Sequence, residues 1–422
     1  MIVRKAFKFK LKTSKREKIF FSKVAGCTRL VWNKSLAMQK DNCEYINSEF
    51  KRLGGKAMLL KEAKKLKKYL YKKHFPTGYD ITTKALVQIW KKSEELSFLN
   101  DCPAQTLQKP VADLDKALFK AFSKKGGFPR FKKKGSRDSI HFPQGFKVNN
   151  NKVFLPKIGN IKFFNSRKIL GTVKNVTVTS DGLNNWFISF FTEKEVDVVE
   201  RNVGEIGIDL GVTNFATTSN GQFIKKPKKL KQLEIIKRRV SKSLARKKKG
   251  GKNREKVRIV LNKTHKRITN IRNDFLYKFS TTLSKNHATI VLEDLKVSNM
   301  SKSAKGNVEE HGKNVKAKSG LNREILANAW YSFRTMLEYK QKYSGGKVLT
   351  INPRNTSLTC ASCGTVDKQS RLSQSSFECT GCKCKENADI NAAKNILEAG
   401  RVSLGDIEKF TSLAQESSVR LA

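Results

Sequence analysis

Apolar positions in the first 123 residues follow two rhythms in succession. Residues 3–11 alternate apolar and basic side chains with a period of two, which predicts a strand that buries one face. Ser14 and Glu17 then have the spacing of a capping box, and a helical apolar stripe follows to Val31. The pattern stays mostly helical and rich in lysine to about residue 123, so we expect a helical module over residues 13–123.

The pattern changes to short strands after a break at Gly126 and Gly127. Asp181 and Gly182 supply turn residues between two of these strands. We expect the first strand, residues 1–12, to pair with the later region, residues 124–199, in a split, wedge-like β-barrel domain. The strands predicted in the later region are residues 153–155, 161–164, 176–178 and 186–191.

A third pattern begins near residue 203, where apolar strands alternate with long helices, as is typical of an α/β unit. Residues 206–210 and 215–218 flank Gly211 and predict a hairpin. Residues 399–422 show little pattern and are expected to form a C-terminal tail, with disorder as one alternative. Between hairpin and tail we predict a basic helical stretch at 228–286 with a break at 250–251, strands at 288–292 and 348–351, and an amphipathic helix at 326–337.

The charge balance points to a polyanionic partner. The 422 residues contain 87 lysines and arginines against 36 aspartates and glutamates, a formal net charge of +51. Basic residues recur in nearly every segment, which favours nucleic acid over a solubilising surface, and the excess suits a long RNA together with DNA. No run of about 18 apolar residues and no signal-peptide pattern occurs, so we expect a cytoplasmic protein without a membrane partner.

Three acidic residues stand at positions that suit a metal site. Asp209 and Glu293 each end an apolar strand, and Asp389 lies near the start of a predicted helix, followed by Ala392 and Ala393. Taken singly, each has an ordinary alternative as a turn or helix-start residue. Together they predict a carboxylate cluster that repels itself unless divalent cations compensate it. Two Mg²⁺ ions, with Mn²⁺ as a substitute, would then activate water and stabilise the leaving oxygen of a phosphodiester.

Five of the eight cysteines crowd into one short segment. Cys360 and Cys363 form one pair separated by two residues, and Cys379 and Cys382 form a second such pair. This spacing is typical of a zinc ribbon, in which four thiolates close the coordination sphere and the Zn²⁺ is structural. Cys384 is close enough in sequence to be an alternative fourth ligand in place of Cys382.

The order and spacing of several motifs over residues 1–398 resemble the TnpB nucleases encoded by bacterial insertion sequences. Two departures from the family pattern are Leu358, where many relatives carry a polar residue, and Lys383, where glycine is usual. The motifs are residues 28–33 (TRLVWN), 102–105 (CPAQ), 127–132 (GFPRFK), 207–212 (GIDLGV), 293–295 (EDL), 355–364 (NTSLTCASCG) and 387–396 (NADINAAKNI).

The resemblance implies an RNA-guided DNA endonuclease that pairs a guide RNA with double-stranded target DNA beside a short flanking motif. It implies that Asp209, Glu293 and Asp389 hold the catalytic metals of an RNase H-like RuvC domain, residues 200–354 and 385–398. A zinc-ribbon insert for target nucleic acid would occupy residues 355–384. The expected fold class is therefore multidomain α/β with a β-barrel and a helical module.

Three other functions stay open at this level. A compact type V CRISPR effector carries the same motifs, and the sequence does not separate it from TnpB. A guided DNA-binding regulator without nuclease activity is disfavoured by the intact carboxylates. A strand-transferring transposase is permitted by the metal site alone. Oligomeric state and the flanking motif are not encoded in any recognisable pattern.

Overall fold

The computed structural model describes residues 1–134, 138–197, 204–307 and 309–419, with side chains described as far as Leu404. The chain divides into two compact units, Met1–Val196 and Asp197–Ala422. None of the helices in the described ranges combines the length and apolar character that crossing a membrane requires.

The first unit contains a seven-stranded sheet in the order β2-β6-β7-β1-β5-β4-β3. The first strand pairs antiparallel with β7 along most of its length and with β5 at its end, as expected from the sequence. The edge strands β2 and β3 do not pair with each other within the described residues, so closure into a barrel stays a prediction. The strands are β1 (Ile2–Lys12), β2 (Ser139–Phe142), β3 (Lys147–Asn149), β4 (Lys152–Leu155), β5 (Gly159–Phe163), β6 (Thr172–Ser180) and β7 (Trp186–Glu195).

Alternation along these strands builds the core of the unit. Phe9, Phe163 and Phe190 come from three neighbouring strands, and their ring centroids lie 5.2–5.9 Å apart. Helix α1 (Lys15–Arg52) begins at the predicted capping box and sets Phe21 against Trp186 at 5.1 Å. The period-two pattern therefore places one aromatic face of the sheet under α1.

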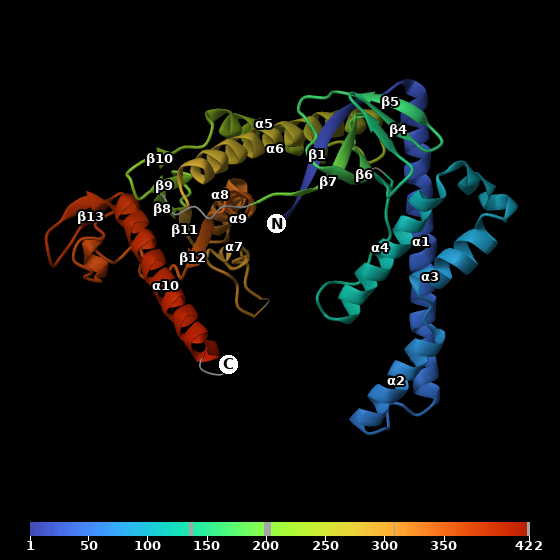
Figure 1. The fold of residues 1–422 in the computed structure, drawn as a ribbon, viewed down its shortest axis with the longest axis horizontal. Helices are drawn as coiled ribbons and strands as arrows, with labels where there is room; N and C mark the ends of the chain where they lie inside the picture. Colours follow the sequence, from blue (N-terminus) through green and yellow to red (C-terminus); the bar gives the residue numbers. More distant parts are fainter. Residues whose placement is uncertain (135–137, 198–203, 308, 420–422) are drawn as a thin grey trace. The chain divides into compact units, whose positions relative to one another are not determined.

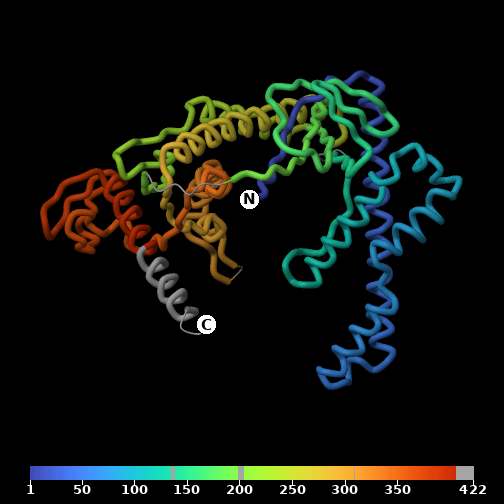
Figure 2. Tube along the Cα trace, in the orientation of Figure 1, coloured from blue at the N-terminus to red at the C-terminus, as the bar shows by residue number. Residues whose placement is uncertain are grey.

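The helical part of this unit follows the pattern predicted over residues 13–123 (Figures 1 and 2). Asn33 on α1 holds the loop near residue 132 by a reciprocal pair of hydrogen bonds with the Lys132 backbone, 3.0 and 2.8 Å long. Besides α1, the helices are α2 (Leu60–His74), α3 (Gly78–Asp80), a π-helix (Ile81–Trp90), a 3-10 helix (Glu94–Asp101) and α4 (Ala104–Phe122).

The second unit is built on a five-stranded mixed sheet in the order β10-β9-β8-β11-β12. The strands β8, β11 and β12 run parallel, and β9 and β10 complete an antiparallel edge that includes the predicted hairpin. The strands are β8 (Glu205–Asp209), β9 (Ala216–Thr218), β10 (Phe223–Ile224), β11 (Thr289–Glu293) and β12 (Lys347–Ile351).

Helices cover both faces of this sheet. Ile290 and Leu292 face a cluster with α6, α8 and α9, whereas Val291 packs with Ile396 of α10 on the opposite face. The nearly continuous apolar strands of the sequence are explained by this two-sided burial. The helices are α5 (Lys228–Ala245), α6 (Lys252–Asn286), α7 (Val297–Met300), α8 (Val315–Asn328), α9 (Trp330–Ser344) and α10 (Ala388–Val419).

Helix α10 extends beyond residue 399, where the sequence analysis placed the start of a tail. Ala399 packs on the cluster of Val291 and Ile396, and a Cβ at Gly400 would lie 2.5 Å from the Val291 side chain. The tail boundary at residue 399 is therefore wrong, because apolar and small residues continue to contact the sheet one turn further on.

Candidate active site and cysteine cluster

Asp209 and Glu293 leave neighbouring parallel strands at the same edge of the sheet. Ile208 of β8 lies opposite Leu292 of β11. The next residues, Asp209 and Glu293, therefore lie side by side at the ends of the two strands. In each strand the three residues before the acid are buried, and the acid at the end is only partly buried. The register thus brings together two residues that are 84 positions apart, the difference between 293 and 209.

Asp389 reaches this edge because α10 lies very close to β8. A Cβ built on Gly207 would lie 2.2 Å from the carbonyl oxygen of Ala393, so only glycine permits the contact. Ala392 and Ala393 are buried on the helix, as the sequence predicted from their small size. Asn214 donates its side-chain amide toward Asp389 Oδ2 over 3.5 Å, and the Asp389 N–H donates to Asn387 Oδ1 over 3.0 Å.

Asp209 is influenced electrostatically by the other two carboxylates. Burial, followed by the charges of Glu293 and Asp389, raises the pKa of Asp209 to about 7, while Arg371 acts in the opposite direction. Burial also raises the pKa of Glu293, against a hydrogen bond from Thr356. A buried group of hard carboxylate oxygens without an adequate counter-charge suits a divalent cation such as Mg²⁺. The donor set therefore fits the expected metals, although the three carboxylates do not form a group with all ligand atoms within 4.8 Å.

The sequence patterns did not indicate three residues that act on the carboxylates. Thr356 Oγ1 donates to Glu293 Oε1 over 2.6 Å, Asn214 contacts Asp389, and Arg371 influences Asp209. Thr356 belongs to one of the quoted motifs, which is the one signal that pointed to it. Its partner lies 63 positions away, so no local pattern could assign the contact.

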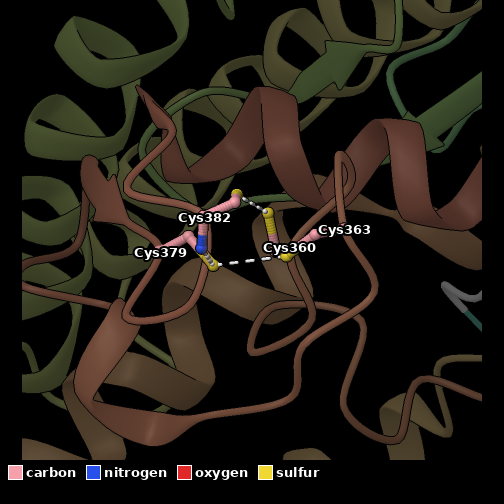
Figure 3. Close-up of side chains that lie close together, drawn as sticks. All are labelled: Cys360, Cys363, Cys379 and Cys382. Carbon is pink, nitrogen blue, oxygen red and sulfur yellow. Dashed lines mark hydrogen bonds between the residues drawn. The ribbon is translucent and has the colours of Figure 1, made fainter.

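The four predicted cysteines converge in the insert between β12 and α10 (Figure 3). Cys360 and Cys382 have Sγ atoms 3.7 Å apart, and Cys363 and Cys379 have Sγ atoms 3.5 Å apart. Tetrahedral zinc with Zn–S bonds of about 2.3 Å places sulfur atoms roughly 3.8 Å apart. In the described part of the chain, this is the one group of three or more potential ligands whose donor atoms all lie within 4.8 Å of one another.

Local hydrogen bonds prepare two of the thiols for ionisation. Bonds with the hydroxyl and the backbone of Thr365 lower the pKa of Cys363 to about 6. The backbone N–H of Cys382 donates to Cys379 Sγ over 3.5 Å, and this bond lowers the pKa of Cys379. Thiolates are the form that binds metal, so the loop favours ligation.

Cys384 lies outside the group of four. Its thiol contacts Ser362 Oγ at 3.5 Å, and its carbonyl oxygen accepts from the Cys379 N–H over 2.9 Å. Lys383 has a φ of 61°, the left-handed region that glycine adopts more easily, at a cost of roughly 1 kcal/mol. The turn at Lys383 directs Cys382 toward the cluster and Cys384 away from it.

The insert is anchored to the helix that carries Asp389. Asn391 Nδ2 donates to Thr359 O over 2.7 Å, and Asn391 Oδ1 accepts from the Ala361 N–H over 2.8 Å. Asn395 Nδ2 donates to the carbonyl oxygens of Thr356 and Thr359 over 2.9 and 2.7 Å. The asparagines of the last motif therefore join the cysteine loop to α10.

Comparison with known proteins identifies the family. The chain is 41% identical over 402 residues to the "Putative RNA-guided DNA endonuclease InsQ" of Escherichia coli K12, covering 94% of this chain and 93% of the relative. The chain belongs to the TnpB family. This TnpB-family chain is also 30% identical over 404 residues to a "Putative RNA-guided DNA endonuclease" of Streptomyces pristinaespiralis, covering 94% and 90% of the two chains.

Three family profiles match this TnpB-family chain. Their descriptions are "Probable transposase" for residues 189–304, "Cas12f1-like, TNB domain" for residues 330–396 and "Helix-turn-helix domain" for residues 1–45. Residues 1–45, all of which are described, form β1 and the first part of α1, so a pair of helices joined by a turn is not present there.

A solved complex is also similar in structure. The Cas12f1 chain in a complex with guide RNA and target DNA aligns with a TM-score of 0.47 and 15% identity, covering 94% of this chain and 98% of that chain.

Proposed function

We propose that this protein is an RNA-guided DNA endonuclease that hydrolyses phosphodiester bonds with two divalent metal ions. The observation that carries the proposal is that Asp209 and Glu293 end neighbouring parallel strands and that the charges of Glu293 and Asp389 add to the raised pKa of Asp209. The names of two relatives that match nearly the whole chain support the same activity.

The three carboxylates would hold the metal ions, preferably Mg²⁺, which supply a Lewis acid and a lowered pKa of bound water. The protein's own contribution is to position these ligands. Thr356 donates a hydrogen bond to one carboxylate oxygen of Glu293, and Asn214 contacts Asp389. The close approach of α10 to Gly207 fixes the position of Asp389 relative to β8. Outer partners of this kind orient metal ligands and tune their basicity.

The sheet order and the helices on both faces support assignment of the second unit as an RNase H-like RuvC domain, residues 200–354 and 385–398. Residues 355–384 would form a zinc ribbon that contacts target nucleic acid, with Zn²⁺ on Cys360, Cys363, Cys379 and Cys382. We assign residues 1–12 and 124–199, of which 135–137 and 198–199 lie outside the described residues, to a wedge-like barrel and residues 13–123 to a recognition module. The partners are a guide RNA and double-stranded DNA, in keeping with the charge of +51.

The decisive experiment is purification of the protein from cells that carry its native locus, followed by sequencing of the RNA that copurifies. A transcript of a transposon end supports a TnpB guide, whereas repeat-derived RNA would support a compact CRISPR effector. The complex is then assayed for Mg²⁺-dependent cleavage of a matched plasmid beside Asp209→Ala. Absence of bound RNA together with absence of cleavage would contradict the proposal, and undiminished cleavage by the variant would remove Asp209 from the site.

A further inference from the structure

A basic cavity of about 560 Å³ lies in the second unit, beside the turn that follows Asp209. Val212 and Thr213 of that turn form part of its wall, together with residues of α5, α6 and α8. Lysine and arginine side chains outnumber the two acidic ones, Glu234 and Glu324, and Glu234 is already paired with Lys237. The cavity therefore has an excess of positive charge.

Arg272 of α6 lines this cavity, is partly exposed and has one unsatisfied polar atom. Its Nε is shielded from solvent and has no hydrogen-bond partner within the described residues. A shielded guanidinium N–H without an acceptor is costly, so a change of side-chain conformation that brings this N–H to an acceptor in the cavity is favourable. The planar fork of arginine matches the oxygens of a phosphate group, which are the strongest acceptors that a nucleic acid offers.

The wall of the cavity is connected to the turn after Asp209 by hydrogen bonds. Lys226 Nζ donates to Asn328 Oδ1 over 2.7 Å, and Asn328 Nδ2 donates to the carbonyl oxygen of Gly211 over 3.4 Å. Asn328 is only 1% exposed, so this connection is internal and well defined. A group bound in the cavity would therefore be positioned relative to the end of β8.

The start of α5 adds to the positive potential of the cavity. Pro227 and Lys228 line it, and the N-terminus of this 18-residue helix has no side-chain cap. Uncapped N–H groups of a helix favour an anion at that end. Leu230 and Ile268 form an apolar part of the wall, which reduces competition from water.

We propose that this cavity binds a backbone phosphate of a nucleic-acid strand and so fixes that strand next to the carboxylate site, a role that rests on the proposed function. RNA and DNA share the phosphodiester chemistry, so the strand that supplies the phosphate is identified by experiment. Arg272 provides the bidentate contact, and Lys231 and Arg323, which also line the cavity, add charge around it.

The test is ethylation interference on the guided complex in EDTA, with the guide RNA and each DNA strand end-labelled in turn. Arg272→Gln is compared with Lys256→Gln, which removes the same charge from an exposed position of α6 outside the cavity. We expect the wild type to lose binding when one or two phosphates of one strand are ethylated, and Arg272→Gln alone to lose this sensitivity. Affinity should fall about tenfold for Arg272→Gln and less than twofold for Lys256→Gln.

An unchanged interference pattern in Arg272→Gln, or equal losses in both variants, would overturn the cavity proposal. Arg323→Gln serves as the second variant if the melting temperature of Arg272→Gln is lowered. If the wild type neither retains RNA nor cleaves DNA, the proposed function fails instead. The cavity is then tested with free single-stranded RNA and DNA. The cavity proposal requires that Arg272→Gln, and not Lys256→Gln, again loses the sensitivity to phosphate ethylation.

Discussion

Thr356 donates its hydroxyl to the carboxylate of Glu293 over 2.6 Å, across 63 positions of sequence. The bond lowers the pKa of Glu293 against the effect of burial. Replacement of Thr356 by valine keeps the side-chain shape but removes the donor, so the pKa of Glu293 should rise. We expect cleavage to fall about 10- to 100-fold, the range found for outer partners of metal ligands.

The measurement for Thr356 is the pH dependence of single-turnover cleavage with saturating Mg²⁺. The acidic limb should move to higher pH in Thr356→Val and return toward the wild-type position in Thr356→Ser, which restores the hydroxyl. Identical limbs in all three proteins would show that the hydroxyl does not influence Glu293.

Asp209 should make the metal-free protein less stable as the pH rises. Its pKa is about 7 in the folded state against 3.8 as its ordinary value, so between these values the folded state binds a proton that the unfolded state has lost. The stability contributed by protonation of Asp209 is thus fully present below pH 3.8 and is lost as the pH rises through about 7, by up to about 4 kcal/mol. The free energy of unfolding in EDTA should therefore decrease over this range relative to Asp209→Asn, which does not titrate.

Addition of Mg²⁺ at pH 8 supplies the control for Asp209. The ion binds the ionised carboxylates and should stabilise the wild type more than Asp209→Asn. Parallel stability curves for the two proteins from pH 4 to 7 would contradict the raised pKa.

Substitution of Cys382 and of Cys384 should have different effects on zinc binding. Cys382→Ser removes a member of the group of four and should abolish stoichiometric zinc binding and expose residues 355–384 to protease. Cys384→Ser is the matched control, because its Sγ contacts Ser362 rather than the cluster. Bound zinc is measured by elemental analysis. Loss of zinc in Cys384→Ser but not in Cys382→Ser would show that Cys384, and not Cys382, is the fourth zinc ligand.

Gly207→Ala should loosen α10 from the sheet. The added Cβ would meet the Ala393 carbonyl oxygen at 2.2 Å and the Leu397 nitrogen at 2.7 Å, and both are backbone atoms that cannot rotate away. We expect a loss of about 3 kcal/mol in unfolding free energy, together with reduced cleavage. Gly320→Ala on α8 is the control, because its Cβ meets only the flexible end of Arg323 at 3.7 Å. Equal stability of both variants by denaturant unfolding would contradict the close packing.

Features that depend on neighbours along the chain could be predicted from the amino-acid pattern. The two periodicities located the strands β1, β4, β5, β6, β7, β8, β9, β11 and β12 and the helices α1, α5 and α6, and the spacing of the cysteines identified their cluster. The short strands β2, β3 and β10 showed no such pattern. The strand-end positions of Asp209 and Glu293 and the helix-start position of Asp389 were likewise local. Such features follow from side-chain alternation, helix caps and ligand spacing, which are properties of short segments.

Features that depend on contacts between distant segments became visible only in the folded protein. The register of β8 and β11 placed Asp209 beside Glu293, and the packing of α10 on Gly207 brought Asp389 to them. The hydrogen bond from Thr356 and the isolation of Arg272 Nε depend on partners from other elements. The register of paired strands and the close packing of a helix on a sheet depend on burial of an entire face of the sheet. The sequence of a short segment does not contain that information.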